Sequence, residues 1–297
     1  MFIKRKSILY ILAAAILWGC TGVFFKELSV FGLTSMQVVF LRTLTATAGL
    51  GFWLLIRNRE AFKIKRQDLW CFIGTGLLSL LFFNWCLYEA ISRNGLAISA
   101  VLLYTAPAFV AVLSALLFKE KLSLPRCGIL TLVLLGCALI SGIIGVAGVN
   151  LEGVIFGLGS GLGYALYSIF GRYALNREYK PQTIAFYTFS FCAAGSGFLS
   201  LILTDTTSLT MQMSNPNVLL LTLALGIIGC LFPYILYTKG LKNVTGAEAS
   251  MTATLEPVVA TLLGMIIYHE TLSVWQIIGA VLILGSILLL SRRPTVH

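Results

Sequence analysis

The stretch "TATLEPVVATLLGMIIYHETLSV" (residues 252–274) decides how the whole sequence is interpreted. An earlier stretch, "LLYTAPAFVAVLSALLFKEKLSL" (residues 102–124), aligns with it along its full length without a gap, and Pro107 matches Pro257. A long segment that recurs within one chain indicates an internal repeat. The chain is therefore expected to contain two related halves, with a proline at the same place in each.

The composition predicts that both halves lie in a membrane. Of the 297 residues, 58% are hydrophobic and only 11% are charged, whereas a soluble domain is typically about 25% charged. Ten apolar runs are each close to the roughly 20 residues that a transmembrane helix needs. They cover residues 8–26, 34–56, 68–89, 97–118, 124–143, 152–175, 182–203, 217–239, 247–268 and 274–291. We therefore expect an all-α integral membrane protein with ten transmembrane helices, five in residues 1–146 and five in residues 147–297.

The basic residues predict how these helices are oriented. If the N-terminus is cytoplasmic, all of the 21 Lys and Arg residues except Lys26, Arg42 and Arg93 fall in or beside cytoplasmic segments. This bias follows the positive-inside rule. It predicts a multi-pass protein of the cytoplasmic membrane with both termini in the cytoplasm. The net charge of +10 is then a topology signal first and a contact with lipid headgroups second, and no nucleic-acid partner is expected.

An odd number of helices in each half has a consequence for topology. After five crossings the second half enters the membrane from the other side, so it should be inverted relative to the first. The segment "WGCTGVFFK" (Trp18–Lys26) aligns more weakly with "YALYSIFGR" (Tyr164–Arg172), so Lys26 and Arg172 should lie on opposite faces. Inverted repeats are typical of secondary transporters, in which both halves contribute to a site near the middle of the membrane.

A family resemblance agrees with this interpretation. The run "EPVVATLLGMIIYHETLSVWQIIGAVLILGSILLL" resembles the EamA-like transporters of the drug/metabolite transporter (DMT) superfamily, and "YTAPAFVAVLSALLFKEKLSL" is similar to the matching segment of the first EamA repeat. The resemblance covers the whole chain as two five-helix EamA repeats. It implies a ten-helix fold, alternating access and small organic solutes, often exported amino acids or metabolites, without specifying a substrate.

Glu256 is the main candidate for chemistry within the membrane. A carboxylate at this depth costs several kcal/mol unless it is neutral, paired or exposed to water. It could bind a proton or the ammonium group of a substrate, or it could be a structural residue hydrogen-bonded to a neighbouring helix. Its repeat partner is Ala106, so only the proline is shared. We expect Pro107 and Pro257 to bend their helices at a gate and Glu256 to supply the chemistry.

Arg42 is the only basic residue well inside a span. It could bind a substrate carboxylate or act as the counter-ion of Glu256, or it could be structural and bind backbone carbonyls. Many aromatic residues fill a core or face lipid, and the weaker candidates among them are Trp85, Tyr88, Tyr167, Tyr187, Tyr234 and Tyr237. The remaining candidates for lining the substrate site are Trp18, Tyr104, Tyr164 and Thr254.

The charged residues near helix ends are expected to be structural. Glu120 and Glu270 should fix the turns that follow their helices. Ser273 and Gln276 have the spacing of a capping box at the start of the last helix. Glu248 lies near the end of a span and is expected to be hydrated.

The glycine-rich run "FGLGSGLGYAL" (residues 156–166) follows no strand and precedes no Walker lysine. A nucleotide site is therefore not expected. The spacing of Gly157 and Gly161, and that of Gly159 and Gly163, favours close helix packing instead.

Export of small organic solutes is the leading function. Proton coupling through Glu256 would suit an exporter of amino acids or amphiphilic amines, while facilitated diffusion is an equal alternative. A second possibility is uptake of a cation such as a quaternary amine, bound by aromatic rings and Glu256. The alternative outside transport is a membrane scaffold. An enzyme, a cofactor and a metal site are not expected, because no intramembrane Asp or His is apparent, and the sequence leaves homodimerisation open.

Overall fold

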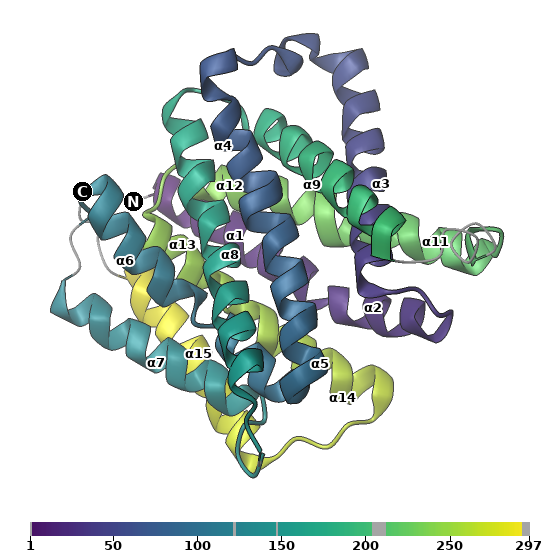
Figure 1. Ribbon diagram of the computed structural model, residues 1–297. Helices are drawn as coiled ribbons and strands as arrows, with labels where there is room; N and C mark the ends of the chain where they lie inside the picture. Colours follow the sequence, from purple (N-terminus) through teal and green to yellow (C-terminus); the bar gives the residue numbers. More distant parts are fainter. Residues whose placement is uncertain (1, 121–122, 147, 204–211, 293–297) are drawn as a thin grey trace.

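The computed structural model describes residues 2–120, 123–146, 148–203 and 212–292, and this part of the chain is helical with no strand. Within it, eight helices are long and apolar enough to cross a membrane, and two shorter apolar helices accompany them. The prediction of an all-α membrane protein with ten transmembrane helices is confirmed. The helices pack into one bundle (Figure 1).

The first half contains α1 (Phe2–Gly19), α2 (Thr21–Val30), α3 (Ser35–Arg57), two short 3-10 turns (Arg59–Phe62 and Arg66–Asp68), α4 (Leu69–Ile73), a π-helical segment (Gly74–Leu81), α5 (Phe82–Leu103), α6 (Ala106–Phe118) and α7 (Leu124–Ile140). The second half contains α8 (Leu151–Asn176), α9 (Pro181–Leu203), α11 (Pro216–Ala224), a π-helical segment (Leu225–Leu231), α12 (Phe232–Leu241), α13 (Gly246–Ala253), α14 (Leu255–Tyr268) and α15 (Val274–Arg292). The π-helical segment therefore lies within the third membrane span of each half.

The third and fourth spans are not separated by a loop. Their boundary lies inside α5, at Gly95, whose φ of 71° and ψ of 175° depart from the helix. A positive φ of this kind suits glycine, which has no Cβ to clash with the backbone. The part of α5 after Gly95 and the whole of α6 together form the fourth span.

The fourth and ninth spans are each interrupted within the span. α5 ends at Leu103 and α6 begins at Ala106, while α13 ends at Ala253 and α14 begins at Leu255. At each interruption a threonine hydroxyl, from Thr105 or Thr254, donates to the carbonyl three residues before it at 2.6 Å.

Each proline lies in the first turn of the helix that follows its interruption. A missing N–H costs little in a first turn, because that turn has no helical acceptor for its amides. Pro107 and Pro257 therefore lie at the start of the helical segments α6 and α14. Their role as a bend at a gate stays a prediction.

α6 and α14 also end in the same way. Lys119 (φ 56°, ψ 29°) and His269 (φ 55°, ψ 31°) adopt the left-handed conformation that stops each helix. The amide of the next residue then donates back to the helix, from Glu120 to the Ser114 carbonyl at 3.3 Å and from Glu270 to the Gly264 carbonyl at 3.4 Å. The predicted capping box is confirmed: the backbone amide of Ser273 donates to Gln276 Oε1, and that of Gln276 donates to Ser273 Oγ.

The two halves interleave instead of forming separate bodies. α1 packs against α12, and α8 packs against α5. Because each joins the first span of one half to the third span of the other half, these two contacts are equivalent by the repeat. The same holds for α1 with α14 and α6 with α8. α3 lies along α9, and α7 lies along α15 (Figure 1). Every one of these contacts joins one half to the other, so the core is shared between them.

The close contact of α8 with α5 depends on glycine. A Cβ on Gly161 would lie 2.7 Å from Thr105 Oγ1 and 2.8 Å from the Leu102 carbonyl oxygen, and one on Gly157 would overlap the Leu102 side chain. The prediction that these glycines allow close helix packing is confirmed.

The outer surface of the helices is apolar. Leu116, Leu201 and Leu288 are largely exposed, as expected for side chains that face lipid instead of water. Buried hydroxyls such as those of Ser160 and Thr188 donate to carbonyls of their own helices, which satisfies them without water.

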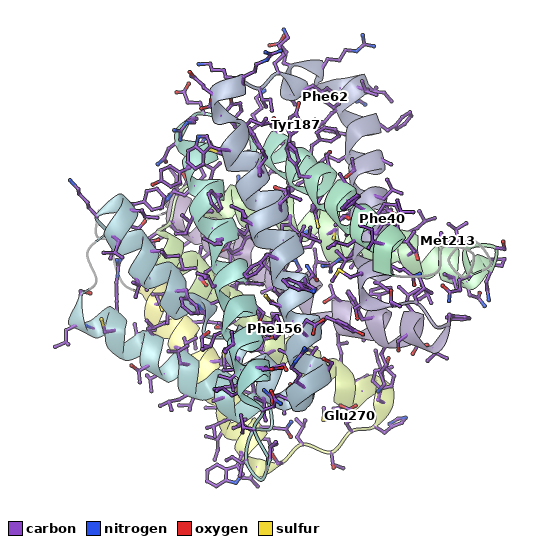
Figure 2. All side chains as sticks on the ribbon, viewed as in Figure 1. Phe40, Phe62, Phe156, Tyr187, Met213 and Glu270 are labelled. Carbon is purple, nitrogen blue, oxygen red and sulfur yellow. The ribbon has the colours of Figure 1, made fainter. Side chains whose placement is uncertain are left out.

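Polar contacts sort the helix ends into two faces. On the first, here called the N-terminal face, Lys4 Nζ and Arg126 Nη2 lie 3.1 Å and 2.8 Å from Glu248 Oε1. On the second, here called the opposite face, Lys26 Nζ lies 3.6 Å from Glu270 Oε1. If the ten spans cross the membrane in alternating directions, the helix ends joined by each of these contacts lie on the same side of the membrane. Figure 2 shows Glu270 at the other end of the bundle from the loop that carries Phe62, where Tyr187 donates to the Phe62 carbonyl.

Glu248 is not hydrated, and the expectation that it would be is wrong. It is 2% exposed and lies in the first turn of α13, every residue of which is buried. The Thr245 side chain caps this helix by accepting from the Glu248 amide. The ion pairs with Lys4 and Arg126 offset the cost of burying the carboxylate.

Candidate functional site

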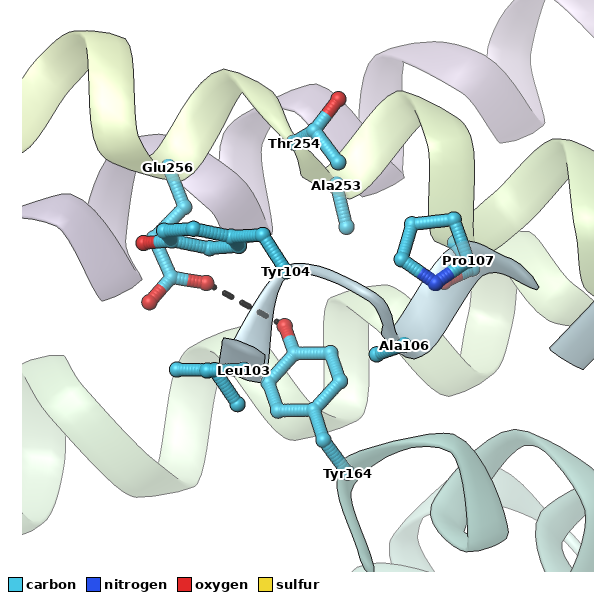
Figure 3. A pocket seen from close by; sticks show the side chains of 9 residues that line it. Leu103, Tyr104, Ala106, Pro107, Tyr164, Ala253, Thr254 and Glu256 are labelled. Atoms are coloured by element: carbon cyan, nitrogen blue, oxygen red, sulfur yellow. Dashed lines mark hydrogen bonds between the residues drawn. The ribbon is translucent and has the colours of Figure 1, made fainter. Parts of the chain in front are cut away.

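Glu256 lies in the first turn of α14, immediately after the interruption at Thr254. The N-terminus of a helix carries unpaired amides and a partial positive charge, which stabilise a nearby carboxylate. Tyr164 on α8 donates its hydroxyl to Glu256 Oε2 at 3.2 Å (Figure 3). Ala106 occupies the first turn of α6 without an acid. The interrupted helix thus gives the second half a supported carboxylate that the first half lacks.

A small cavity lies beside this carboxylate, where the two interrupted helices meet. Its volume of about 10 Å³ is roughly the room for one water molecule. The lining residues are Leu103, Tyr104, Ala106 and Pro107 from the first half and Tyr164, Ser250, Ala253, Thr254 and Glu256 from the second (Figure 3). The structure therefore brings together around one space five of the eight residues predicted most strongly for the substrate site and the gate, namely Tyr104, Pro107, Tyr164, Thr254 and Glu256.

Two of the lining residues refine the chemistry of this cavity. The Thr254 hydroxyl donates its hydrogen to the Met251 carbonyl. It can therefore act only as a hydrogen-bond acceptor towards a solute. Ser250 is not among the candidates from the sequence. Its Oγ is buried and has no hydrogen-bond partner among the residues that the structure describes, and one turn of α13 separates it from the interruption. A small polar residue inside an apolar span was the only signal for it.

Trp18 belongs to a neighbouring aromatic cluster. Its ring lies 5.2 Å from the ring of Tyr234, 5.4 Å from that of Tyr237 and 6.1 Å from that of Tyr164. These rings line a second cavity of about 10 Å³. Its lining residues are Trp18, Ser79, Phe83, Tyr164, Tyr167, Ser168, Tyr234 and Tyr237. Tyr164 lines both cavities and therefore links the aromatic cluster to Glu256.

Hydroxyl groups fix the orientation of this cluster. The Tyr237 hydroxyl and Ser168 Oγ are 2.7 Å apart, as are the Tyr167 hydroxyl and Thr238 Oγ1. Tyr234 and Tyr237 therefore lie closer to the centre of the site than the sequence analysis suggested. The sequence could not show that α12 turns both side chains towards α1.

Arg42 is not gathered with the other candidates. Its side chain is 6% exposed, its Nη2 donates to Asn84 Oδ1 at 2.8 Å, and its guanidinium lies 5.2 Å from the ring centre of Phe25. Asn84 donates in turn to the Leu80 carbonyl, which aims its oxygen at Arg42. Among the described residues, no ion pair joins Arg42 to Glu256, and neither cavity includes Arg42. Asn84 was missed, although an asparagine inside an apolar span was a visible signal.

Comparisons with known proteins agree with the fold. The model of the EamA-like transporter family matches residues 5–142 and 151–292. "Uncharacterized transporter YxxF" of Bacillus subtilis (strain 168) is 27% identical, covering 98% of this chain and 91% of its own. An "Uncharacterized transporter" of Archaeoglobus fulgidus is 29% identical, covering 95% of both.

Further matches extend the same picture. "Uncharacterized inner membrane transporter YicL" of Salmonella typhimurium is 24% identical, covering 97% of this chain and 95% of its own. A crystal structure with 18% sequence identity superposes with a TM-score of 0.80 over 95% of both chains, and so shares the fold. The family model covers both halves of the sequence, and its two matches coincide with the two sets of five spans. The chain is a multi-pass membrane transporter and belongs to the EamA-like transporter family.

Proposed function

We propose that this protein is a secondary transporter and that it moves small organic solutes by alternating access. The site lies where the α5–α6 and α13–α14 interruptions meet, between halves 1–146 and 147–297 arranged as inverted repeats. The observation that carries the proposal is the Glu256 carboxylate, placed at a half-helix N-terminus, bound by Tyr164 and open to a cavity lined by both halves. Half-helices that point their ends at a central site are a general feature of such transporters.

The size of the cavities supports movement during transport. Each has a volume of about 10 Å³, so neither can hold an organic solute in this conformation. A site of this kind must enlarge when its helices move. The interruptions before Pro107 and Pro257 supply joints where half-helices can move without breaking regular backbone hydrogen bonds.

We infer that both termini are cytoplasmic and that transport runs outwards. The charge bias supports this orientation, because the N-terminal face carries nearly all of the basic residues outside the spans. Export fits a carboxylate that can exchange an incoming proton for an outgoing ammonium group, since the two cations compete for the same oxygens. Coupling to protons is therefore part of the proposal, and facilitated diffusion is the alternative outcome of its test.

The test compares Glu256→Gln with wild-type protein in proteoliposomes. A thermal-shift screen of amino acids, amines and nucleobases first selects the solutes to be assayed. Replacing a charge-assisted contact with a neutral one should slow transport by about 10- to 100-fold and abolish its dependence on a proton gradient. Glu60→Gln, in the exposed turn before α4, is the matched control. Unchanged rate and pH dependence in Glu256→Gln would disprove the role of this carboxylate.

Uptake of a small organic cation is the second candidate. The rings of Trp18, Tyr164, Tyr234 and Tyr237 lie together near Glu256, and aromatic faces attract quaternary ammonium groups. Flux measurements in membrane vesicles separate uptake from export. An importer should accumulate the solute in right-side-out vesicles, whereas an exporter should accumulate it in everted vesicles.

A further inference from the structure

Each face of the bundle carries an ion pair of the same design. On the opposite face, Lys26 Nζ of α2 lies 3.6 Å from Glu270 Oε1, just beyond α14. On the N-terminal face, Arg172 Nη2 of α8 lies 3.0 Å from Glu120 Oε1, just beyond α6. Each pair thus joins the first span of one half to the end of the fourth span of the other half.

The repeat maps one pair onto the other. In the alignment of the two halves, Lys26 corresponds to Arg172 and Glu270 corresponds to Glu120. Exchanging the halves therefore converts the ion pair of the opposite face into that of the N-terminal face. Two unrelated surface pairs would not be expected to keep this register.

The neighbouring residues follow the same register. Glu27 corresponds to Tyr173, and Tyr268 corresponds to Phe118. The Tyr268 hydroxyl donates to Glu27 Oε1 at 3.1 Å, while the rings of Phe118 and Tyr173 are 4.8 Å apart. Four residues on each face thus make matching contacts. The opposite-face quartet is Lys26, Glu27, Tyr268 and Glu270, and the N-terminal-face quartet is Arg172, Tyr173, Phe118 and Glu120.

The two quartets differ in how tightly they are closed. The Arg172 and Glu120 side chains are only 17% and 15% exposed, and Arg172 also donates to the carbonyls of Leu241 and Val244 at 3.0 Å and 2.9 Å. The Lys26 and Glu270 side chains are 53% and 59% exposed, and Lys26 Nζ lies 3.4 Å from the ring centre of Tyr268. This structure therefore has a tight contact on the N-terminal face and a loose one on the opposite face.

We propose that the two quartets are the gates of the transporter and that each opens as the other tightens. Each quartet ties together two segments that lead to the central cavities. The N-terminal-face quartet joins α8, which carries Tyr164, to α6, which carries Pro107. The opposite-face quartet joins the α1–α2 span, which carries Trp18, to α14, which carries Glu256. The inference rests on the alternating access proposed above and assigns it to named residues.

Electrostatics explains why the gates would alternate. Separating an ion pair on one face costs free energy, and tightening the matching pair on the other face recovers part of that cost. Since the quartets are equivalent by repeat, the two end states can have similar free energies. Weakening one quartet should then shift the population towards the state in which its face is open.

Hydrogen exchange followed by mass spectrometry tests this in the purified full-length protein without any solute. Glu270→Gln should raise exchange about two- to five-fold at residues 268–272, as expected for losing an exposed pair, and should lower exchange at residues 241–246 on the far face. Glu120→Gln should do the reverse by about 10-fold or more, because its pair is more buried. Glu60→Gln should change neither segment.

Two further variants keep the outcome clear. Lys26→Glu combined with Glu270→Lys restores an exposed pair with its charges exchanged, and it should return both segments towards wild-type exchange. If Glu120→Gln does not fold, Arg172→Lys replaces it, because lysine keeps the charge but loses the planar guanidinium whose two terminal nitrogens reach the carboxylate and the two carbonyls.

The outcomes separate this inference from the proposed function. Increased exchange only on the mutated face, with the far face unchanged, would show two independent clamps and overturn the gate assignment even if solute flux is measured. Reciprocal changes in exchange without flux of any assayed solute would instead support the gates and refute the solute class.

Discussion

The buried carboxylate of Glu248 provides a sharp test of how the N-terminal face is held together. Glu248 is 2% exposed, and it binds Arg126, which is 5% exposed, and Lys4, which is 14% exposed. Glu248→Gln keeps the size of the side chain but removes its charge. Two cations would then lie beside a neutral amide at the start of α13, the helix that leads to the interruption before Glu256.

The expected loss of stability follows from this burial. Removing one partner of a buried ion pair costs about 3–5 kcal/mol. The partial exposure of Lys4 favours the lower end of that range. At about 2–4 °C per kcal/mol for a large domain, the Tm should fall by about 6–12 °C.

Thermal unfolding of the purified protein in detergent, followed by tryptophan fluorescence, measures the effect. Glu60→Gln is the matched control, since it removes the same charge from a pair with Lys63 in which both side chains are 77% exposed. That variant should lose less than about 1 kcal/mol. Equal Tm values for the two variants would refute the reasoning. Glu248→Leu combined with Arg126→Leu should recover part of the loss, because apolar residues need no desolvated partner.

Two further predictions concern the site and its scaffold. Tyr164→Phe removes the hydroxyl that binds Glu256. Its transport rate in proteoliposomes should fall by about 5- to 10-fold, which is less than the fall expected for Glu256→Gln. If Tyr164→Phe transports at the wild-type rate, this contact is not used. Gly161→Ala places a Cβ against the backbone of α5 and should lower the free energy of unfolding by about 1–3 kcal/mol. Gly22→Ala is its control, because no heavy atom lies within 4 Å of the added Cβ. This variant should unfold at or slightly above the wild-type temperature. Equal shifts for the two glycine variants would contradict the packing argument.

The candidate site was partly accessible from the sequence. The aligned prolines drew attention to Tyr104, Thr254 and Glu256, and these residues line one cavity because both interruptions face it. Arg42 stood out by its charge, yet it lies outside both cavities because Asn84 and Phe25 hold it. Whether the lining residues bind a solute stays a prediction.

Other features depended on contacts that no linear pattern describes. The sequence predicted hydration for Glu248 because it lies near the end of a span, but two cations from distant segments cover it. The aligned prolines drew attention to both spans, but the threonine hydroxyl that donates to the preceding turn at each interruption was found only in the structure. The ion pairs on the two faces are equally invisible before folding, although their members stand at aligned positions.

Hydropathy, the distribution of charge and an internal repeat are properties of the linear chain. They were enough to predict a membrane protein of ten helices in two related halves, because a span must be apolar wherever it packs. The pairing of helices across the halves is different, since it depends on which face of each helix meets a neighbour. Small residues such as Gly161 decide how closely those faces approach. Only the folded structure therefore places Glu256 against Tyr164 and sets a tight ion pair on one face against a loose one on the other.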